Sequence, residues 1–544
     1  MPASSGPEEA IVYDMARNAN LIQRMNIGDT VTRSAWRSPG HLAVVDGERR
    51  LDYRAFNDEV NRVANSLVAS GYGRGDALVL MSGNSLEFLL LYYACAKLGV
   101  ACVPINLGWQ SSEVGYVLGH CGARGVAVEA QLMGKLLPAL DGAGHVEDVI
   151  VLPSTGAGAP ASTGAGAPRF IGLEELTAGS SSAEPDAYVE DRDPVTYLYT
   201  SGTTSGPKGV VGSHLGIYME SITSALELGF NSSDRTAAMM PMFHTAQLNG
   251  VISPLVIMGG TIVVQRGFDP AALLELIETE RITHIFGLPM MYRAMLDHPD
   301  VTKRDLSSLR RATYAMAPMP DDDLRRALEV FKCDFSLGFG QTEMAPITTV
   351  FKPEQQLTHT GSVGSPTCSV QVGIMDDQGK LLEWGETGEI VYRGPQTMEG
   401  YLHDEAATAQ AFAHGWFHSG DIGHFGPDGV LWFDDRKKDV IKTGGENVAS
   451  IEVERALYAA EPRIAEVVVI GLPHERWGEA ITAVVVPREG EVLVGEEVLA
   501  TAKQRLAGFK VPKAVIVAGE LPRTSTGKVQ KHVLREKLGD FYRS

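Results

Sequence analysis

The sequence is poor in cysteine: its five cysteines, among 544 residues, form no CxxC pair and no metal-ligand spacing. A sparse, odd-numbered set argues against a disulfide scaffold and favours buried thiols in a reducing compartment. Long apolar runs are also missing. Apolar runs such as Ala77 to Met81 are far shorter than the roughly 20 residues that a membrane span needs. The acidic N-terminus lacks the basic-then-apolar pattern of a signal peptide. We therefore expect a cytoplasmic protein without a membrane span.

Positive charge is in deficit, with 47 Lys and Arg against 67 Asp and Glu, a formal net charge of −20. Nucleic-acid binding needs clustered Lys and Arg to neutralise phosphates, so we expect no nucleic-acid partner. Apolar residues make up 44% and charged residues 21%, which is ordinary for a globular protein. The length indicates more than one domain. A homodimer is left open.

Apolar strands alternate with amphipathic helices through the first two thirds of the chain, which predicts a layered α/β fold with a largely parallel sheet. Helices are expected over 51–70, 85–98, 450–460 and 495–507. Strands are expected over 77–81, 101–104, 125–129, 147–152, 195–199, 261–265, 283–287, 312–316, 370–374, 388–392, 429–433, 466–470, 480–487 and 514–518. The short β segments after 366 predict a β-rich subdomain. We expect a large N-terminal domain over 1–435 and a small α+β C-terminal domain over 436–544.

Residues 153–169 break this alternation with a tandem copy of Ser-Thr-Gly-Ala-Gly-Ala-Pro. This composition has no apolar face to bury, so it predicts a surface loop.

The strongest local signal is residues 197–209, YLYTSGTTSGPKG, in which an apolar strand runs into glycines, hydroxyls and one lysine. Small residues let backbone N–H groups approach an anion, hydroxyls add donors, and lysine adds a point charge. The segment therefore predicts a phosphate cradle. It is not a Walker A loop, because Gly209 follows Lys208. The alternative is a plain surface turn rich in Ser, Thr and Gly.

This loop resembles the phosphate loop of the adenylate-forming superfamily, which includes acyl-CoA synthetases, peptide-synthetase adenylation domains and firefly-type luciferases. The copy here has Ser205-Gly206 where the family has Gly-x. Further segments resemble the family's motifs in the family's order: GFGQTE at 338–343, WFHSGD at 416–421, DRKKD at 435–439, GGEN at 444–447 and LPRTSTGK at 521–528. The resemblance covers essentially the whole chain.

The resemblance implies that a carboxylate attacks the α-phosphorus of ATP to give acyl-AMP and pyrophosphate, after which a thiol, usually that of CoA, displaces AMP. The implied β/γ-phosphate cradle is Thr200, Ser201, Gly202, Thr203, Thr204 and Lys208. By the same resemblance Thr342 bonds the α-phosphate and Glu343 holds Mg²⁺, with Thr200 as a second metal contact. Phe339 stacks on adenine, while Asp421 and Arg436 bind the ribose. The alternative for a lone acidic side chain is a solvated surface charge.

The same resemblance implies that Lys528 stabilises the adenylation transition state and that the small, mobile domain then rotates about Lys438. Gly444 and Gly445 are expected to line the thiol tunnel. A single lysine among charges can equally be a solvated side chain, so that alternative stays open for Lys438.

The acid-binding site is expected from apolar segments and, by resemblance, from Phe243, His244, Ala315, Met316, Ala317, Gly338 and Gly340. His244 can alternatively be an ordinary polar residue beside a core segment, and Met316 can be a core gap-filler. These segments show no Asp for an amino group and no basic pair for a second carboxylate. An apolar site with flexible Met walls suits a fatty, aryl or polycyclic acid.

The sequence thus predicts an AMP-forming acyl-CoA synthetase that uses ATP, Mg²⁺ and CoA. Two readings of other classes stay open: a stand-alone adenylating enzyme that passes acyl-AMP to an amine or a carrier protein, and a non-catalytic nucleotide-binding module. The particular acid, the acceptor and the pathway are not readable from the sequence.

Overall fold

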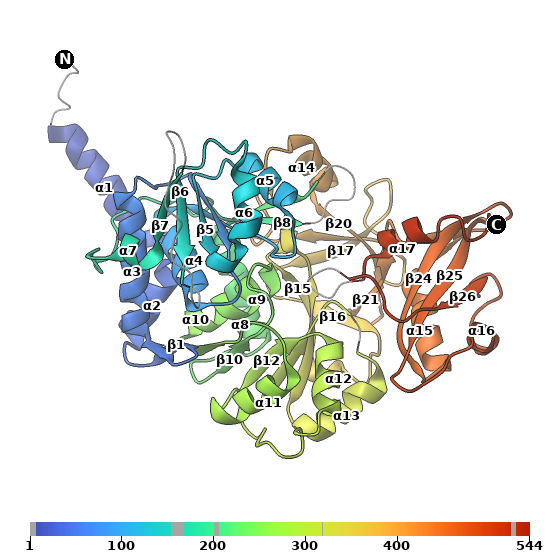
Figure 1. Ribbon diagram of the computed structural model, residues 1–544. Helices are drawn as coiled ribbons and strands as arrows, with labels where there is room; N and C mark the ends of the chain where they lie inside the picture. Colours follow the sequence, from blue (N-terminus) through green and yellow to red (C-terminus); the bar gives the residue numbers. More distant parts are fainter. Residues whose placement is uncertain (1–6, 154–167, 201–205, 318, 524–528, 544) are drawn as a thin grey trace. The chain divides into compact units, whose positions relative to one another are not determined.

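The computed structural model describes residues 7–153, 168–200, 206–317, 319–523 and 529–543. The chain packs into two compact units, one of residues 1–371 and 393–412 and one of residues 372–392 and 413–544. We describe each unit by itself. The expected α/β class, with a large N-terminal part and a smaller C-terminal part, is confirmed (Figure 1). The expected boundary between 435 and 436 concerns a catalytic movement and stays a prediction.

The first sheet of the larger unit has a mainly parallel core of buried, apolar strands. Its strand order is β19 (Gly400–Tyr401), β9 (Lys208–Ser213), β8 (Pro194–Thr200), β4 (Ala101–Pro104), β3 (Ala77–Met81), β5 (Gly125–Glu129), β6 (Asp148–Leu152) and β7 (Arg169–Gly172). Every residue of β3, β4, β5 and β6 is buried, as expected for parallel strands covered on both faces. At one edge β9 and β19 are antiparallel additions.

The second sheet of this unit places a set of parallel strands in register, so that their carboxyl ends meet at one edge. The order is β16 (Ser362–Pro366), β15 (Ile347–Phe351), β14 (Asp334–Gly340), β13 (Arg311–Tyr314), β12 (His284–Gly287), β10 (Arg235–Ala238), β11 (Thr261–Val264), β1 (Leu42–Asp46) and β2 (Arg49–Asp52). The strands from β1 to β14 in this order run parallel. In α/β sheets, ligands bind outside the carboxyl ends of such strands.

Helices cover these sheets. They are α1 (Pro7–Gln23), α2 (Asp29–Arg37), α3 (Tyr53–Ala69), α4 (Leu86–Leu98), α5 (Ser111–His120), α6 (Met133–Leu140), α7 (Leu173–Thr177), α8 (His214–Glu227), α9 (Thr245–Gln247), α10 (Ser253–Met258), α11 (Pro270–Thr279), α12 (Pro289–Asp297), α13 (Asp321–Phe331) and α14 (Glu405–Ala411). Figure 1 shows α11, α12 and α13 side by side. Helix α4 is buried along its whole length. It starts at Ser85, whose hydroxyl accepts from Phe88 N–H, and ends at Gly99 with φ of 69°.

The smaller unit combines two sheets. One contains β17 (Gln371–Met375), β18 (Gly388–Arg393), β20 (Phe417–Phe425) and β21 (Leu431–Arg436). The other contains β23 (Glu446–Val448), β22 (Ile441–Thr443), β25 (Gly478–Pro487), β24 (Ile464–His474) and β26 (Ala514–Val517). The helices α15 (Ser450–Ala460), α16 (Gly495–Ala502) and α17 (Lys531–Lys537) complete it.

One expected helix is too long. The helix expected over 495–507 ends at Ala502 instead. The Thr501 hydroxyl bonds back to the carbonyl of Val498, and Gln504 N–H bonds to the carbonyl of Thr501, so the chain tightens into a turn. The repeat within 153–169 falls almost wholly in residues outside the described part.

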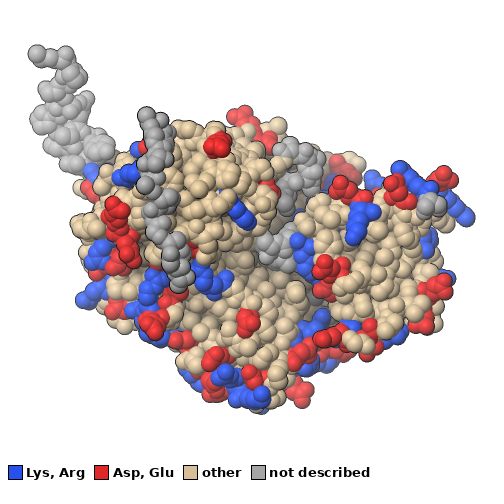
Figure 2. All heavy atoms as spheres, viewed as in Figure 1, with Lys and Arg blue, Asp and Glu red and all other residues tan. Residues whose placement is uncertain are grey.

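The described chain has no helix with the length and apolar character needed to cross a membrane. On the face drawn in Figure 2, acidic and basic side chains are interspersed over the described surface.

Candidate active site

The predicted phosphate loop joins two antiparallel strands of the first sheet. Thr200, the last residue of β8, is the cross-strand partner of Lys208, the first residue of β9. Gly206 has φ of 115°, a conformation that favours glycine, and a side chain there would meet the ring of Tyr116 at 3.4 Å. The positive φ and the nearby ring of Tyr116 therefore explain why glycine occupies position 206 of this variant loop. The other cradle residues, Ser201, Gly202, Thr203 and Thr204, lie outside the described residues.

One tyrosine, Tyr401, contacts both the Glu343 carboxylate and Lys208, the lysine that follows this loop. Tyr401 donates its hydroxyl hydrogen to Glu343 Oε1 at 3.0 Å, and Lys208 Nζ lies 4.8 Å from the centroid of the Tyr401 ring. All three side chains are half-buried. The structure therefore brings the predicted phosphate lysine and the predicted metal carboxylate to one place.

The segment that carries Glu343 is shaped by a close backbone approach. Gly340 ends β14, and a Cβ there would lie 1.8 Å from the carbonyl oxygen of Pro346, so only glycine fits. A 3₁₀ turn over Thr342–Met344 follows. Phe339 and Gly338 are half-buried on the same strand. The strand, glycine and turn hold Thr342 and Glu343 at the carboxyl end of β14.

The predicted acid-binding segments meet at one edge of the second sheet. Gly287 pairs with Tyr314, and Tyr314 pairs with Leu337, so β12 and β13 end at the same level of the sheet, whereas β14 continues to Gly340. Leu288 and Ala315 leave the sheet there, at the level of Gly338 on β14. The neighbouring β10 runs parallel to β12 and leads to Phe243 and His244. The arrangement fits a binding site whose walls come from several strand ends.

Met316 lies at this edge and is not a core residue. Its side chain is 49% exposed, and its φ of 69° is unusual for a residue with a side chain. The core-packing alternative for Met316 is therefore wrong. Ala315 is buried and Ala317 is exposed. Whether Met316 selects the acid stays a proposal.

His244 combines burial with an unused nitrogen. Its ring lies 4.7 Å from that of Phe243, and its Nε2 atom is buried without a hydrogen-bond partner among the described residues. Burial lowers the pKa of His244 to about 4, so the imidazole is neutral near pH 7. A neutral, unpartnered imidazole can donate to or accept from a bound molecule, and it adds no charge to an apolar site.

In the smaller unit the two predicted ribose residues form a cross-strand pair. Asp421 on β20 and Arg436 on β21 are direct partners, and Arg436 Nε lies 2.8 Å from Asp421 Oδ1. Asp421 is buried, whereas Arg436 is half-buried. The pair presents a carboxylate and a guanidinium together, which suits a sugar with two adjacent hydroxyls.

The predicted hinge and tunnel residues occupy turns. Lys438 is exposed in the turn between β21 and β22. Gly444 and Gly445, with φ of 61° and 89°, form the two-residue turn between β22 and β23, in which Thr443 pairs with Glu446. Positive φ at both positions is what a type I′ hairpin requires, so the turn alone accounts for the glycine pair. Lys528 lies outside the described residues.

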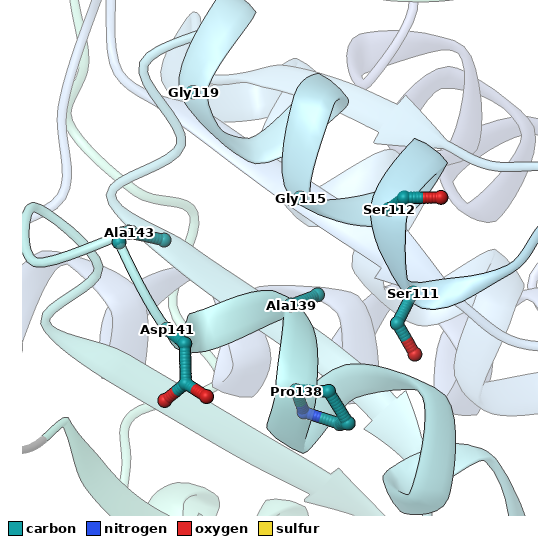
Figure 3. A pocket seen from close by; sticks show the side chains of 9 residues that line it. Ser111, Ser112, Gly115, Gly119, Pro138, Ala139, Asp141 and Ala143 are labelled. Atoms are coloured by element: carbon teal, nitrogen blue, oxygen red, sulfur yellow. The ribbon is translucent and has the colours of Figure 1, made fainter.

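A surface hollow elsewhere has different chemistry. A cavity of about 330 Å³ lies between α5 and α6 and is lined by small or polar residues: Ser111, Ser112, Gly115, Gly119, Pro138, Ala139, Asp141, Gly142 and Ala143 (Figure 3). This lining contains no lysine or arginine, so the hollow does not suit a nucleotide phosphate.

The residues present fit Mg²⁺ bound with ATP. In the described part of the chain, no group of three or more His, Cys, Asp or Glu side chains is placed to hold a metal ion. Mg²⁺ is commonly held by one or two carboxylates together with substrate phosphates and water. A single carboxylate, Glu343, which contacts the same tyrosine as the predicted phosphate lysine, meets that requirement.

Tyr401 is the site residue that sequence reasoning missed. The pairing of β19 with β9 places Tyr401 opposite Val210, close to Lys208. A strand of two residues has no periodicity to detect. A long-range pairing of this kind cannot be read from local sequence pattern.

Comparison with known proteins covers nearly the whole chain. The family model described as AMP-binding enzyme matches residues 31–402, and the model of the AMP-binding enzyme C-terminal domain matches residues 452–528. A feruloyl-CoA synthase of Amycolatopsis is 36% identical over 95% of this chain and 100% of its own length. A long-chain-fatty-acid–CoA ligase of Mycobacterium tuberculosis is 34% identical over 94% of this chain and 98% of its own.

Among solved structures, the anthranilate CoA ligase AuaEII in complex with anthranoyl-AMP superposes with a TM-score of 0.85. It is 26% identical, and the match covers 94% of this chain and 97% of that one.

Proposed function

The chain belongs to the AMP-binding enzyme family, and we propose that it is an ATP-dependent ligase that joins an apolar carboxylic acid to CoA. The predicted superfamily and enzyme class are confirmed by these matches. In the first step the acid attacks ATP to give acyl-AMP and pyrophosphate. In the second step the thiol of CoA displaces AMP. ATP, Mg²⁺ and CoA are therefore the cofactor and co-substrates.

One observation supports the assignment most directly: Lys208 and Glu343 converge on Tyr401, on the same unit as the strand ends that carry Phe243, His244 and Met316. The first group suits a metal-bound polyphosphate and the second suits an apolar acid. Preorganised charge of this kind stabilises the charge that develops when phosphoryl oxygens and carboxylate meet. Asp421 and Arg436, on the smaller unit, are proposed to bind the ribose.

The acid is proposed to be an aryl or fatty acid. The strand-end segments carry Phe243, Met290, Met291 and Met316, all apolar and adaptable. Curated relatives named as acting on ferulate and on long-chain fatty acids fit this chemistry. They do not favour the alternative in which acyl-AMP passes to an amine or a carrier protein.

A cytoplasmic location is proposed from the state of the thiols. Cys95, Cys102, Cys121 and Cys333 are buried and free, and Cys368 is exposed and free. Free thiols suit a reducing compartment.

The test is a screen of acids in two coupled assays on the purified protein. Acid-dependent pyrophosphate release reports adenylation, and a CoA-dependent rise in thioester reports transfer. We expect hydroxycinnamic, aryl-acetic or long-chain acids to support both reactions, and acetate and malonate to support neither. Pyrophosphate release without thioester formation for every acid would favour the amine or carrier alternative. No acid-dependent pyrophosphate release would reject the ligase assignment.

A further inference from the structure

One phenol separates the two charged groups that the proposed adenylation site needs. Tyr401 donates to Glu343 Oε1 at 3.0 Å, while its ring faces Lys208 Nζ at 4.8 Å from the ring centroid. Among the described residues, Lys208 and Glu343 form no ion pair with each other. The hydroxyl therefore holds the anion and the ring holds the cation, each by a different kind of interaction.

The backbone around Tyr401 is tied to both partners. Leu402 N–H donates to the carbonyl of Gly209 at 2.8 Å, next to Lys208. Met398 N–H donates to the carbonyl of Glu343 itself at 2.8 Å. Because the short segment 398–402 bonds to both elements, the position of the phenol relative to Lys208 and Glu343 is set by the main chain. Tyr401 N–H, in turn, donates to the hydroxyl of Thr408 at 2.9 Å.

We propose that Tyr401 is a positioning residue for Mg²⁺·ATP, which aims the Glu343 carboxylate and keeps Lys208 from pairing with it. This inference rests on the proposed function. A direct ion pair between Lys208 and Glu343 would neutralise both groups, and Mg²⁺ and phosphate would then have to break it. With the phenol between them, the carboxylate stays available to the cation and the ammonium to the phosphate. An ordinary phenol is protonated near neutral pH, so the Tyr401 hydroxyl can donate.

Two variants separate the roles of the hydroxyl and the ring. Tyr401→Phe keeps the ring beside Lys208 and removes the donor to Glu343. We expect ATP binding in EDTA to be unchanged, and the Mg²⁺ concentration for half-maximal enhancement of ATP binding to rise about 10-fold, the lower end for loss of a partner that orients a metal ligand. Tyr401→Leu removes both interactions. It should also weaken metal-free ATP binding, by about threefold or more, because Lys208 becomes free to pair with Glu343.

The measurement is isothermal titration of the full-length protein with ATP, in EDTA and over a series of Mg²⁺ concentrations. Tyr53→Phe is the matched control. The Tyr53 hydroxyl donates to the carbonyl of Gly260 at 2.7 Å, so this variant also loses one phenol hydrogen bond, at a residue outside the predicted site. It should leave the Mg²⁺ requirement at the wild-type value.

A double variant tests the mechanism. If the phenol acts through Glu343, Tyr401→Phe should raise the Mg²⁺ requirement of the wild type but not that of Glu343→Gln. An unchanged Mg²⁺ requirement in Tyr401→Phe overturns the proposal, whatever happens to thermal stability. An equal shift in the Glu343→Gln background overturns it as well. Failure of the ligase assignment is a separate result, because it would appear as absent acyl-AMP formation with the Mg²⁺ shifts still present.

Discussion

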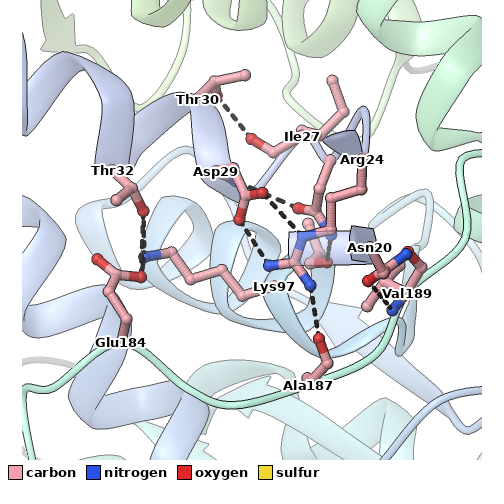
Figure 4. A network of polar contacts seen from close by, with 12 residues as sticks. Asn20, Arg24, Ile27, Asp29, Thr30, Thr32, Lys97, Glu184, Ala187 and Val189 are labelled. Atoms are coloured by element: carbon pink, nitrogen blue, oxygen red, sulfur yellow. Dashed lines mark hydrogen bonds and ion pairs between the residues drawn. The ribbon is translucent and has the colours of Figure 1, made fainter. Parts of the chain in front are cut away.

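A buried lysine on helix α4 allows a sharp stability prediction. Lys97, on helix α4, is 1% exposed, and its ammonium contacts Glu184 Oε2 at 2.6 Å (Figure 4). It also donates to Asn57 at 2.8 Å and to Asn61 at 2.6 Å. Glu184 is 43% exposed. The network joins α3 and α4 to the segment that leads into β8, the strand that carries the phosphate loop.

We expect Glu184→Gln to destabilise the protein because it leaves a buried ammonium without its carboxylate. Removing one partner of a fully buried pair costs about 3–5 kcal/mol. Glu184 is partly exposed, so water already screens its charge and the expected cost falls to about 2–3 kcal/mol. In a Lys97→Met background the same substitution should cost at most about 1 kcal/mol, because no buried charge remains to be compensated. The coupling energy should therefore be about 2 kcal/mol.

The assay is a double-mutant cycle in which urea unfolding is measured for each variant. The free energies of unfolding are taken from the transition that reports unfolding of the larger unit. The control is Arg281 with Asp305, an ion pair of the same length, 2.6 Å, whose side chains are 54% and 51% exposed. A cycle of Arg281→Met with Asp305→Asn should give a coupling energy clearly smaller than that of the buried pair, because water and salt screen an exposed ion pair. A Lys97–Glu184 coupling no larger than that of the control would refute the reasoning from burial.

Four further predictions concern catalysis and pH. Lys528→Ala should slow acyl-AMP formation by at least about 10²-fold while thioester formation from supplied acyl-AMP persists; equal loss of both half-reactions would reject two conformations. Lys438→Pro fixes φ near −65° and should spare adenylation while thioester formation falls, so unaltered thioester formation would exclude the hinge. Met316 has a φ that glycine favours, so Met316→Gly should be tolerated and should shift kcat/KM toward bulkier acids, by roughly 1 kcal/mol per added methylene at most. If the rank order of kcat/KM among the acids is unchanged, Met316 does not select the acid. Burial lowers the pKa of His284 to about 4, below an unfolded value of about 6.5, so the unfolded state binds more protons between these values. Stability should then fall with decreasing pH in that window by up to about 1.4 kcal/mol per pH unit for this residue. His284→Gln should flatten the pH dependence of urea unfolding, and the exposed control His532→Gln should not. A slope identical to that of the wild type would mean that folding does not lower the pKa of His284.

The sequence predicts the buried strands well for a physical reason. A strand covered on both faces must be apolar at every position, so β3 begins and ends where the apolar run 77–81 does. Helix α15 likewise spans the expected 450–460. The end of α16 depends on a hydroxyl that bonds back to the main chain and on a tightened turn, and apolar periodicity contains no information on either.

The division into units shows a second limit. Residues 393–412 pack with the larger unit although the chain on both sides of them belongs to the smaller one. Composition changes along the chain can locate a boundary only where the chain crosses once between units. Here the segment returns because Gly400 and Tyr401 pair with Val211 and Val210. A strand of two residues has no apolar periodicity that a sequence pattern could reveal. Its pairing depends on the edge of β9 that is available to it.

The candidate site shows where motif reasoning stops and geometry becomes necessary. The roles expected for Lys208, Glu343 and Asp421 come from the resemblance of their segments to family motifs, and each residue has a functional group that suits a phosphate, a hard cation or a sugar. Tyr401 meets no ligand requirement of that kind. Its proposed role follows from what lies on its two sides, a carboxylate at its hydroxyl and an ammonium at its ring. A residue that separates opposite charges is chemically unremarkable by itself, so only the fold, by bringing β9, β14 and β19 together, can identify it. The Mg²⁺ titration of Tyr401→Phe is therefore a test of the fold-level argument, just as the screen of acids is a test of the motifs.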